Sequence, residues 1–406
     1  MDKSYKVLIV GGGASGLATA ASLKKRDHSL EIAVVEPSDK HYYQPGWTMV
    51  GAGVFNKEDT IRDTDSIWPS NVMRIKDEVT KFDPKNNQVT LSNNSKISYE
   101  MLIVATGLKL DWDAIEGLSD SLGKNGVTSN YRYDLAPYTW DLVKGIKGKN
   151  AIFTQPPMPI KCAGAPQKAM YLSCDHWQKE GQLNNMNVSF CNAGPVLFGC
   201  ATYVPPLMKY VEKYRINLDF GHNLTKIDGA SQKAWFSVKK EGEDPKTIER
   251  PFDMIHVCPP QRAPDFVAKS PLANDAGWVD VNPETLQHSK FSNVFALGDV
   301  ASTSNAKTVA AARKQAPIVA QNVISCIENK DVKPLYDGYG SCPLTVEKGK
   351  IILAEFGYGG KVMPTFPWDS TKPRRAAWFL KKTILPRIYW GAMFQGREWL
   401  TKTTKA

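Results

Sequence analysis

The chain has 406 residues, of which 42% are hydrophobic, and a formal net charge of +10. This length and apolar content suffice for two or three domains with their own cores. No run approaches the roughly 18 unbroken apolar residues of a membrane span, and the first apolar run is too short for a signal peptide. The seven cysteines contain no C-x-x-C pair and the six histidines show no metal spacing, so we expect neither a disulfide scaffold nor a metal site.

The chain opens with a strand, a glycine turn and a helix. The turn is Gly11-x-Gly13-x-x-Gly16, in which the first glycine makes the tight turn, the second lets the backbone approach a pyrophosphate and the third lets helix pack on strand. Glu36 closes the next strand about 20 residues later, where an acid binds ribose hydroxyls. The pattern predicts a dinucleotide-binding unit with a strand at 6–10, a helix at 17–25 and a strand at 31–36.

Further elements follow in chain order. We expect strands at 72–82, 88–92, 101–106, 151–154, 188–191, 294–297 and 350–356. We expect helices at 169–179, 205–213 and 309–327, and a cysteine-bearing loop at 339–343. Alternation of strands and helices favours an α/β fold with parallel sheets, and a second α/β block begins near Asn150.

Two more segments favour a flavin over a nicotinamide. Residues 102–107 form a buried strand that ends in Thr106-Gly107, and residues 294–299 form another that ends in Gly298-Asp299. Asp299 stands where it can bond a ribityl chain. With the glycine turn, these segments resemble the three FAD-contact points of flavoproteins that have two dinucleotide-binding domains, so we expect FAD.

The second block lacks the glycine fingerprint of a nucleotide site. After the strand at 188–191 only Gly194 and Gly199 remain, and Ala193, Pro195 and Phe198 would crowd a pyrophosphate. The next strand has no convincing acid at its end. We therefore expect this domain to keep the fold without binding a nucleotide, which argues against an NADH-dependent enzyme.

Three motifs carry a resemblance to a known family. Residues 41–47 (HYYQPGW), 160–168 (IKCAGAPQK) and 336–343 (YDGYGSCP) are similar to those of sulfide:quinone oxidoreductases, most of all to the subgroup that includes the mitochondrial enzymes. The resemblance runs over nearly the whole chain. It implies two Rossmann-like dinucleotide-binding-type domains and a C-terminal membrane-associating segment. The implied divisions are an FAD domain at 1–112 and 294–335, a second domain at 113–293 and a C-terminal region at 336–406.

The resemblance also implies a redox pair, Cys162 and Cys342, bridged directly or through extra sulfur. Hydrogen sulfide attacks the bridge and leaves a persulfide on one cysteine, expected to be Cys342, and a thiolate on Cys162. Electrons pass through FAD to a quinone, and a small acceptor such as sulfite or glutathione removes the sulfur. Lys161 and Lys168 flank Cys162 and would favour its thiolate. The remaining five cysteines lie in apolar surroundings typical of a core.

The motifs and the resemblance together predict the residues that contact FAD. Lys307 would offset negative charge on the reduced flavin, and Thr308 begins a helix that points at the same place. The expected contacts are Gly11, Gly13, Ala14, Ser15, Gly16, Glu36, Gln44, Val79, Thr106, Gly107, Asp299, Lys307 and Thr308.

Residues 361–406 carry eight of the ten net positive charges, and the stretch 373–400 interleaves them with aromatic and aliphatic residues. This pattern favours a membrane surface over nucleic acid, with a helix packed on the body as the alternative. Pro386 should divide the stretch into two short helices. We expect a peripheral, monotopic protein on the cytoplasmic face of a bacterial inner membrane.

Three alternatives stay open from the residues alone. A flavocytochrome-type sulfide dehydrogenase subunit shares the flavin and the cysteines but lacks the aromatic tail. A type-two NADH:quinone oxidoreductase needs the second glycine fingerprint. A flavin-binding redox sensor would keep FAD without turnover.

Overall fold

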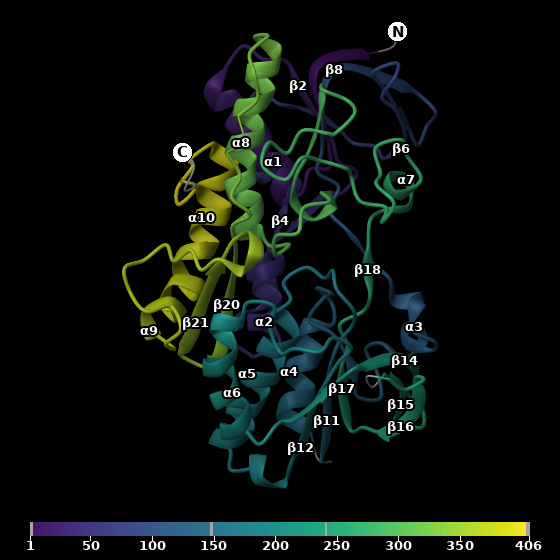
Figure 1. The fold of residues 1–406 in the computed structure, drawn as a ribbon, viewed down its shortest axis with the longest axis vertical. Helices are drawn as coiled ribbons and strands as arrows, with labels where there is room; N and C mark the ends of the chain where they lie inside the picture. The colour runs from purple at the N-terminus through teal and green to yellow at the C-terminus, as the bar shows by residue number, and fades with distance from the viewer. Residues whose placement is uncertain (1–2, 147–148, 240–241, 334, 403–406) are drawn as a thin grey trace.

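The computed structural model describes residues 3–146, 149–239, 242–333 and 335–402. Two sheets lie one above the other along the long axis of the molecule, and the C-terminal segment runs along one side of both (Figure 1). This mixed α/β architecture with parallel and antiparallel strands agrees with the predicted fold class.

The first sheet has seven strands, which come from both of the separate stretches predicted to form the FAD domain. Its order is β5-β2-β1-β8-β7-β6, with β19 pairing β8. Strands β5, β2, β1 and β8 pair in parallel, and β19 pairs in parallel with β8. Strands β6, β7 and β8 form an antiparallel meander. The strands are β1 (Lys3–Val10), β2 (Ile32–Val35), β5 (Met73–Ile75), β6 (Val79–Asp83), β7 (Gln88–Leu91), β8 (Lys96–Val104) and β19 (Val294–Ala296).

Two helices cover one face of this sheet. Helix α1 (Ala14–Arg26) and helix α8 (Val309–Ile327) pack against each other and share a core with β1, β8 and β19. Thr308 caps α8 by accepting a hydrogen bond from the backbone N–H of Ala311 at 3.2 Å. The sheet thus brings residues near 10, 105 and 298 to one edge, where the carboxyl ends of parallel strands meet.

The second sheet is all parallel, with the order β10-β17-β11-β12-β13. Helices α4 and α5 pack on it, α6 shares its apolar core, and a three-stranded antiparallel sheet lies beside it. The elements are β10 (Val127–Thr128), α4 (Ala136–Gly145), β11 (Asn150–Gln155), α5 (Ala165–Lys179), β12 (Asn187–Asn192), α6 (Val204–Lys213), β13 (Asn217–Phe220), β17 (Met254–His256), and the antiparallel strands β14 (His222–Asp228), β15 (Lys233–Val238) and β16 (Lys246–Pro251).

Shorter elements connect these bodies. The strands are β3 (Lys40–Tyr42) paired with β4 (Ile61–Asp63), and β9 (Lys109–Leu110) paired with β18 (Gln261–Arg262). The helices are α2 (Trp47–Val50), α3 (Leu118–Ser121) and α7 (Asp265–Ala268). The 3-10 helices are η1 (Gln44–Gly46), η2 (Lys57–Thr60), η3 (Thr64–Ile67), η4 (Trp112–Ala114), η5 (Leu183–Asn185), η6 (Ala201–Tyr203), η7 (Gly298–Val300), η8 (Tyr358–Gly360) and η10 (Met393–Gln395).

The predicted cysteine loop at 339–343 is wrong, because Cys342 lies within a strand. Strands β20 (Gly340–Glu347) and β21 (Lys350–Phe356) form an antiparallel hairpin that packs on α5. Cys342 and Leu344 are fully buried there. Pro343 is tolerated because β20 is an edge strand, with β21 as its one partner strand in the described part of the chain.

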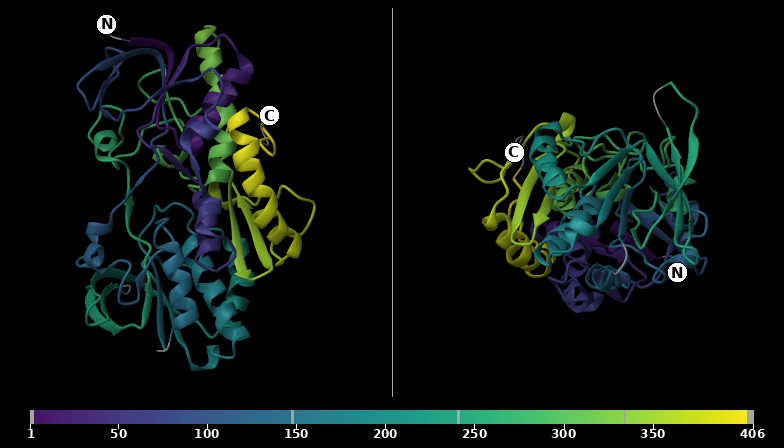
Figure 2. Two further views of the ribbon diagram at one scale, coloured as in Figure 1. Left: turned by 180° about the vertical axis from the view of Figure 1, so that it is seen from behind. Right: turned by 90° about the horizontal axis from the view of Figure 1, so that it is seen from below.

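The predicted break at Pro386 is also absent. Helix α9 (Arg375–Phe379) continues through a π-helical turn (η9, Leu380–Ile384) directly into α10 (Leu385–Gly391). The wider turn accommodates the proline, which stands in the first turn of α10, where its missing N–H costs little. Figure 2 shows this helical segment, in yellow, lying alongside α8.

Much of the C-terminal segment belongs to the core of the body. Tyr389, Met393 and Phe394 are buried in the same apolar cluster as α1 and α8. Other apolar side chains of the segment, Phe379, Trp399 and Leu400, are exposed. Among the described residues, no helix has the length and apolarity that crossing a membrane requires.

Candidate active site

A cavity of about 320 Å³ opens at the carboxyl edge of the first sheet. A Cβ at Gly11 would lie 2.6 Å from the Ala105 carbonyl oxygen, and the backbone there has a φ of +102° that glycine adopts without strain. A Cβ at Gly13 or Gly107 would meet nothing within 4 Å, so both backbones face open space. The hydroxyl of Thr106 is buried in this region with no partner among the described residues. These features fit a bound dinucleotide.

The structure brings most of the predicted FAD contacts to this cavity and to a second cavity that adjoins it, described below. Glu36 lines the cavity and accepts hydrogen bonds from the backbone N–H of Gly12 at 2.7 Å and of Ser38 at 2.8 Å. Gly16 lies behind the wall, where a Cβ would come within 1.9 Å of the Gly11 carbonyl oxygen. Val79 is buried in the apolar core of the sheet and lines neither cavity. The predicted FAD contacts that line one or both of the cavities are Gly11, Gly13, Ala14, Ser15, Glu36, Gln44, Thr106, Gly107, Asp299, Lys307 and Thr308.

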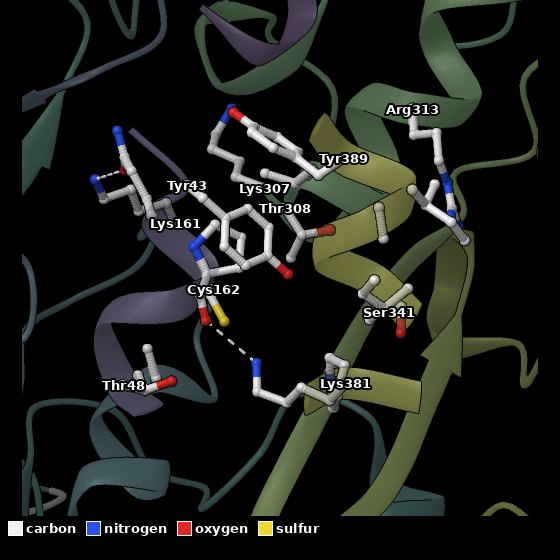
Figure 3. A pocket seen from close by; sticks show the side chains of 18 of the residues that line it. Tyr43, Thr48, Lys161, Cys162, Lys307, Thr308, Arg313, Ser341, Lys381 and Tyr389 are labelled. Atoms are coloured by element: carbon white, nitrogen blue, oxygen red, sulfur yellow. Dashed lines mark hydrogen bonds between the residues drawn. The ribbon is translucent and has the colours of Figure 1, made fainter. Parts of the chain in front are cut away.

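A second cavity adjoins the first, and Cys162 opens onto it (Figure 3). Cys162 precedes α5, which carries Lys168, and the Lys168 ammonium nitrogen lies 3.0 Å from the Cys162 sulfur. Cys342 is within hydrogen-bonding contact of Cys162 from the opposite hairpin, and both are free thiols. A Cβ at Gly164 would lie only 2.5 Å from Leu344, so this glycine lets the hairpin approach. The fold therefore joins the two predicted cysteines.

The two thiols have opposite electrostatic surroundings. A hydrogen bond from the Cys342 thiol, with the Lys168 charge, holds the pKa of Cys162 well below its usual range despite burial. That same contact with Cys162 and burial raise the pKa of Cys342. Burial disfavours the charge on Lys168, but Cys162 and Cys342 together outweigh burial and raise the lysine pKa. The arrangement is a thiolate at Cys162 between a thiol and an ammonium.

The backbone at Cys162 is held in an uncommon conformation. Its φ is +48°, a region that residues other than glycine rarely adopt. The Cys162 N–H donates to the Lys307 carbonyl at 2.8 Å, and the Tyr131 hydroxyl donates to the Lys161 carbonyl at 3.2 Å. Contacts from two separate segments thus hold the backbone that carries the Cys162 sulfur.

Charged groups connect the two cavities. Lys307 donates from its ammonium to the carbonyls of Asp299 and Ala301, both at 2.8 Å, and burial lowers its pKa to about 8. Burial raises the pKa of Asp299, although Lys307 and Lys161 oppose the shift. The Lys161 ammonium donates to the Gln44 side chain. Each of these residues except Ala301 lines the second cavity.

The C-terminal segment supplies a wall that the sequence did not predict. Lys381, in the π-helical turn, is buried and donates to the Pro45 carbonyl at 3.3 Å, and burial and Lys168 lower its pKa to about 7. Tyr389 lines both cavities, and its hydroxyl lies 2.6 Å from Nε2 of the buried His41. Nothing in the local pattern placed these residues beside Cys162, because only tertiary packing brings them there.

The loop after β12 is filled by its own side chains. The Asn192 amide accepts from the Gly194 N–H and donates to the Val196 carbonyl, both at 2.8 Å. Leu197 and Phe198 are buried in the core of the second sheet. A Cβ at Gly194 would lie 3.3 Å from the Asn192 amide oxygen, whereas a Cβ at Gly199 would meet nothing within 4 Å, as at Gly13.

The other cysteines occupy apolar surroundings, with Cys174, Cys191, Cys200 and Cys258 buried and Cys326 partly buried. Burial raises the pKa of Cys191 and that of Cys258 to about 12. Cys258 packs in one cluster with Tyr131 and Cys162, which makes it a neighbour of the site that the sequence did not identify.

Comparison with known proteins places these features in a family. Residues 5–138 match the family model of pyridine nucleotide-disulphide oxidoreductases. The chain is 43% identical to the mitochondrial sulfide:quinone oxidoreductase of Dictyostelium discoideum over 402 residues, which is 98% of this chain and 88% of that protein. It is 40% identical to the mitochondrial sulfide:quinone oxidoreductase of Mus musculus, over 97% of this chain and 87% of that protein.

A solved structure shares the fold. The sulfide:quinone oxidoreductase of Aquifex aeolicus superposes with a TM-score of 0.78 at 21% identity, covering 98% of this chain and 92% of the other. Sequence similarity to a type II NADH:quinone oxidoreductase of Staphylococcus aureus extends over only 28% of this chain, so that alternative is distant. Identity of 43% and 40% to the two mitochondrial proteins, over nearly the full length of this chain, shows that the chain belongs to the sulfide:quinone oxidoreductase family.

Proposed function

We propose that the chain oxidises hydrogen sulfide at Cys162 and Cys342 and transfers the electrons to a quinone. The observation that carries this function is the contact of the two cysteines beside Lys168, on a cavity that continues into the glycine-lined cavity. FAD is the cofactor, and when bound it accepts an electron pair from the thiolates and passes it to the quinone.

The sulfur chemistry balances over three steps. Hydrosulfide attacks Cys342 in a Cys162–Cys342 disulfide, the S–S bond breaks, and Cys162 leaves as a thiolate while Cys342 carries the persulfide. A nucleophilic acceptor then takes the outer sulfur, and the electron pair of the broken bond stays on Cys342. The disulfide re-forms when the two thiolates lose two electrons, which FAD would accept when bound.

Lys168 helps to determine which of the two cysteines sulfide attacks. A disulfide sulfur leaves faster when its thiolate is more stable, and the ammonium at 3.0 Å stabilises the Cys162 thiolate. The raised pKa of Cys342 makes it the poorer leaving group and so the cysteine that sulfide attacks and that retains the persulfide. The roles of both cysteines and of the predicted FAD contacts are part of this proposal.

We also propose the finer division and location of the protein. The FAD domain comprises residues 1–112 and 294–335, the second domain 113–293 and the C-terminal region 336–406. Exposed Phe379, Trp399 and Leu400, with basic neighbours such as Lys382 and Arg387, support contact between this region and a membrane surface. The cytoplasmic face of a bacterial inner membrane stays a prediction, since the two relatives compared are named mitochondrial.

An anaerobic titration tests the function. Purified protein with FAD is titrated with sulfide while the flavin absorbance is followed, and a soluble quinone is then added. Bleaching by about one equivalent of sulfide, followed by recovery on addition of quinone, is the expected result. Bleaching by NADH but not by sulfide would contradict the proposal.

A further inference from the structure

A buried carboxyl group lines the second cavity on the face of the hairpin that does not carry Cys342. Cys342 pairs with Ala354 across the hairpin, and the next pair, Ser341 with Glu355, faces the opposite way because side chains alternate along a strand. Cys342 and Ala354 pack in the core with α5, whereas Ser341 and Glu355 line the cavity. The hairpin thus separates the sulfur of Cys342 from the Glu355 carboxyl group.

Three donors fix the orientation of Glu355. Its side chain, in a residue that is 2% exposed, accepts hydrogen bonds from the Tyr339 hydroxyl and the Thr365 hydroxyl, and from the Thr365 N–H at 3.0 Å. Tyr339 is buried and Thr365 is exposed, and both line the cavity. The carboxyl group therefore lies at the cavity wall, one side chain away from solvent.

Two cations stand beside this carboxyl group. Burial lowers the pKa of Arg313, although Tyr339 and Glu355 oppose the shift, and the Lys314 ammonium lies 3.6 Å from the centroid of the Tyr339 ring. Arg313 lines the cavity, and its buried Nε has no hydrogen-bond partner in the part of the chain that the structure describes. Figure 3 shows Arg313 on the opposite side of the view from Cys162. This end of the cavity therefore offers positive charge to an oxygen atom of a bound molecule.

The wall between the carboxyl group and the C-terminal segment is apolar. Leu353, Phe366, Leu380, Leu385 and Ile388 line the cavity there. The last three belong to the helical segment that begins with α9 and that the proposed function places at a membrane surface. An apolar substrate with carbonyl oxygens, as a quinone is, matches this combination of walls and charges.

The proton balance of the proposed reaction requires a proton from solvent. Oxidation of one hydrosulfide ion to sulfane sulfur releases two electrons and one proton, whereas reduction of a quinone to the quinol consumes two electrons and two protons. One proton per turnover must therefore cross the apolar wall. Asp299 also lines the cavity but faces Lys307 on the cofactor side. Glu355 combines contact with the cavity and a path to solvent through Thr365.

We propose that Glu355 donates this solvent-derived proton to the quinone, a role that rests on the sulfide-oxidising function proposed above. The O–H bond of the Glu355 carboxyl group breaks, and its proton joins one quinone oxygen as that carbonyl becomes a hydroxyl. Arg313 stabilises the negative charge that develops on this oxygen. The carboxylate then takes a proton from solvent beside Thr365, and the second proton of the quinol is the one that hydrosulfide releases. Tyr339 and Thr365 are positioning residues for the carboxyl group.

The test uses the full chain with FAD in stopped flow. The flavin is reduced with sulfide and then mixed with a short-chain benzoquinone or with ferricyanide, which accepts electrons without protons. In Glu355→Gln, the limiting rate of reoxidation at saturating quinone should fall about a hundredfold or more, because a proton donor is lost. Reduction by sulfide, reoxidation by ferricyanide and the quinone affinity, measured by quenching of tryptophan fluorescence, should be unchanged. Glu355→Asp keeps a carboxyl group and should recover much of the rate.

Glu347→Gln is the matched control, since Glu347 lies in the same hairpin and pairs with Lys213 and Lys350 but does not line the cavity. Both acceptors should reoxidise this variant at the rate of the unchanged chain. An equal loss with quinone and ferricyanide in Glu355→Gln, or a weaker quinone affinity with an unchanged limiting rate, overturns the proposal. If Glu355→Gln binds no FAD, Thr365→Val at its exposed position must slow reoxidation by quinone alone. An unchanged chain that sulfide does not reduce would instead sink the proposed function itself.

Discussion

The Lys168 ammonium and the Cys162 sulfur meet at 3.0 Å in a site where both side chains lie against the Cys342 hairpin. One turn of α5 separates the lysine from the glycine that admits the hairpin, so a single helix start places the cation, the sulfur and its partner. An ammonium in so buried a position persists because the thiolate neutralises it.

The first prediction concerns this contact. Lys168→Met should raise the pKa of Cys162, because the charge and the hydrogen bond of Lys168 are lost, although the hydrogen bond from Cys342, the larger cause of the low pKa, remains. The rate of Cys162 alkylation by iodoacetamide, measured on the reduced protein as a function of pH, should therefore rise at a higher pH than in the unchanged chain. Lys168→Arg keeps the charge and should shift the profile much less. An unchanged pH profile in Lys168→Met would refute the role of the lysine.

Both cysteines should be indispensable. Cys162→Ser and Cys342→Ser should fold and bind FAD, since neither lines the glycine-lined cavity, but should lose sulfide-driven quinone reduction by at least about a thousandfold. Cys191→Ser, a buried cysteine at the far side of the second sheet core, should retain turnover. Near-normal rates in Cys342→Ser would rule out the paired-cysteine mechanism.

Reduced nicotinamide nucleotides should be poor electron donors. Leu197 and Phe198 fill the loop in which other members of the superfamily would bind a second nucleotide. Stopped-flow mixing should show the flavin bleaching slowly or not at all with NADH and NADPH, and promptly with sulfide. Fast bleaching by micromolar NADH would instead favour a type II NADH:quinone oxidoreductase.

The exposed aromatic residues of the C-terminal segment should contribute to membrane binding. Phe379→Asp and Trp399→Asp replace side chains that are 58% and 55% exposed, so the fold should persist while liposome affinity drops by about tenfold or more. Val196→Asp, at a 54% exposed position in the loop after β12, is the matched control and should leave the liposome affinity unchanged. Co-sedimentation with vesicles that contain anionic lipid measures this, and equal binding by all three variants would contradict the anchor.

Acid should destabilise the protein through two buried histidines. Burial lowers the pKa of His41 and that of His256 to about 4, below the value of 6.5 that each has when unfolded. The unfolded state therefore binds more protons between these values, so this contribution is complete above pH 6.5 and is lost as the pH falls towards 4. Each histidine should account for a loss of up to about 3 kcal/mol in the free energy of unfolding.

Urea unfolding at several pH values checks this expectation. His256→Gln should flatten the dependence between pH 6.5 and 4, although it lowers stability at neutral pH because Nε2 accepts from the Asn130 N–H. His28→Gln, at an exposed position, should retain the slope of the unchanged chain. Equal slopes in all three proteins would show that His256 is not the group that titrates.

Local patterns predicted the parts of the fold that local chemistry determines. The glycine turn before α1, Glu36 and the whole of α8 lie where the sequence predicts them, since turn geometry and helical periodicity are short-range properties. Cys342 was assigned to a loop from its glycine and proline neighbours, yet its pairing with β21 made it a strand. Lys381, Trp47 and Asn130 line the cavity beside Cys162 but come from distant segments of the chain. The spacing of residues along the sequence does not reveal contacts of this kind.

The π-helical turn at Leu380–Ile384 sets the rotational phase of everything that follows it. The wider turn takes up one residue more than an α-helical turn, so removing one residue there would restore α-helical geometry with little change in the phase of α10. Inserting one residue between this turn and Tyr389 would instead rotate the rest of α10 by about 100°. Tyr389 would then swing away from His41, and the wall that closes both cavities would open. A single-residue insertion after the turn should therefore be more harmful than a deletion within it, because the cofactor side and the sulfur side of the protein depend on the same angular offset.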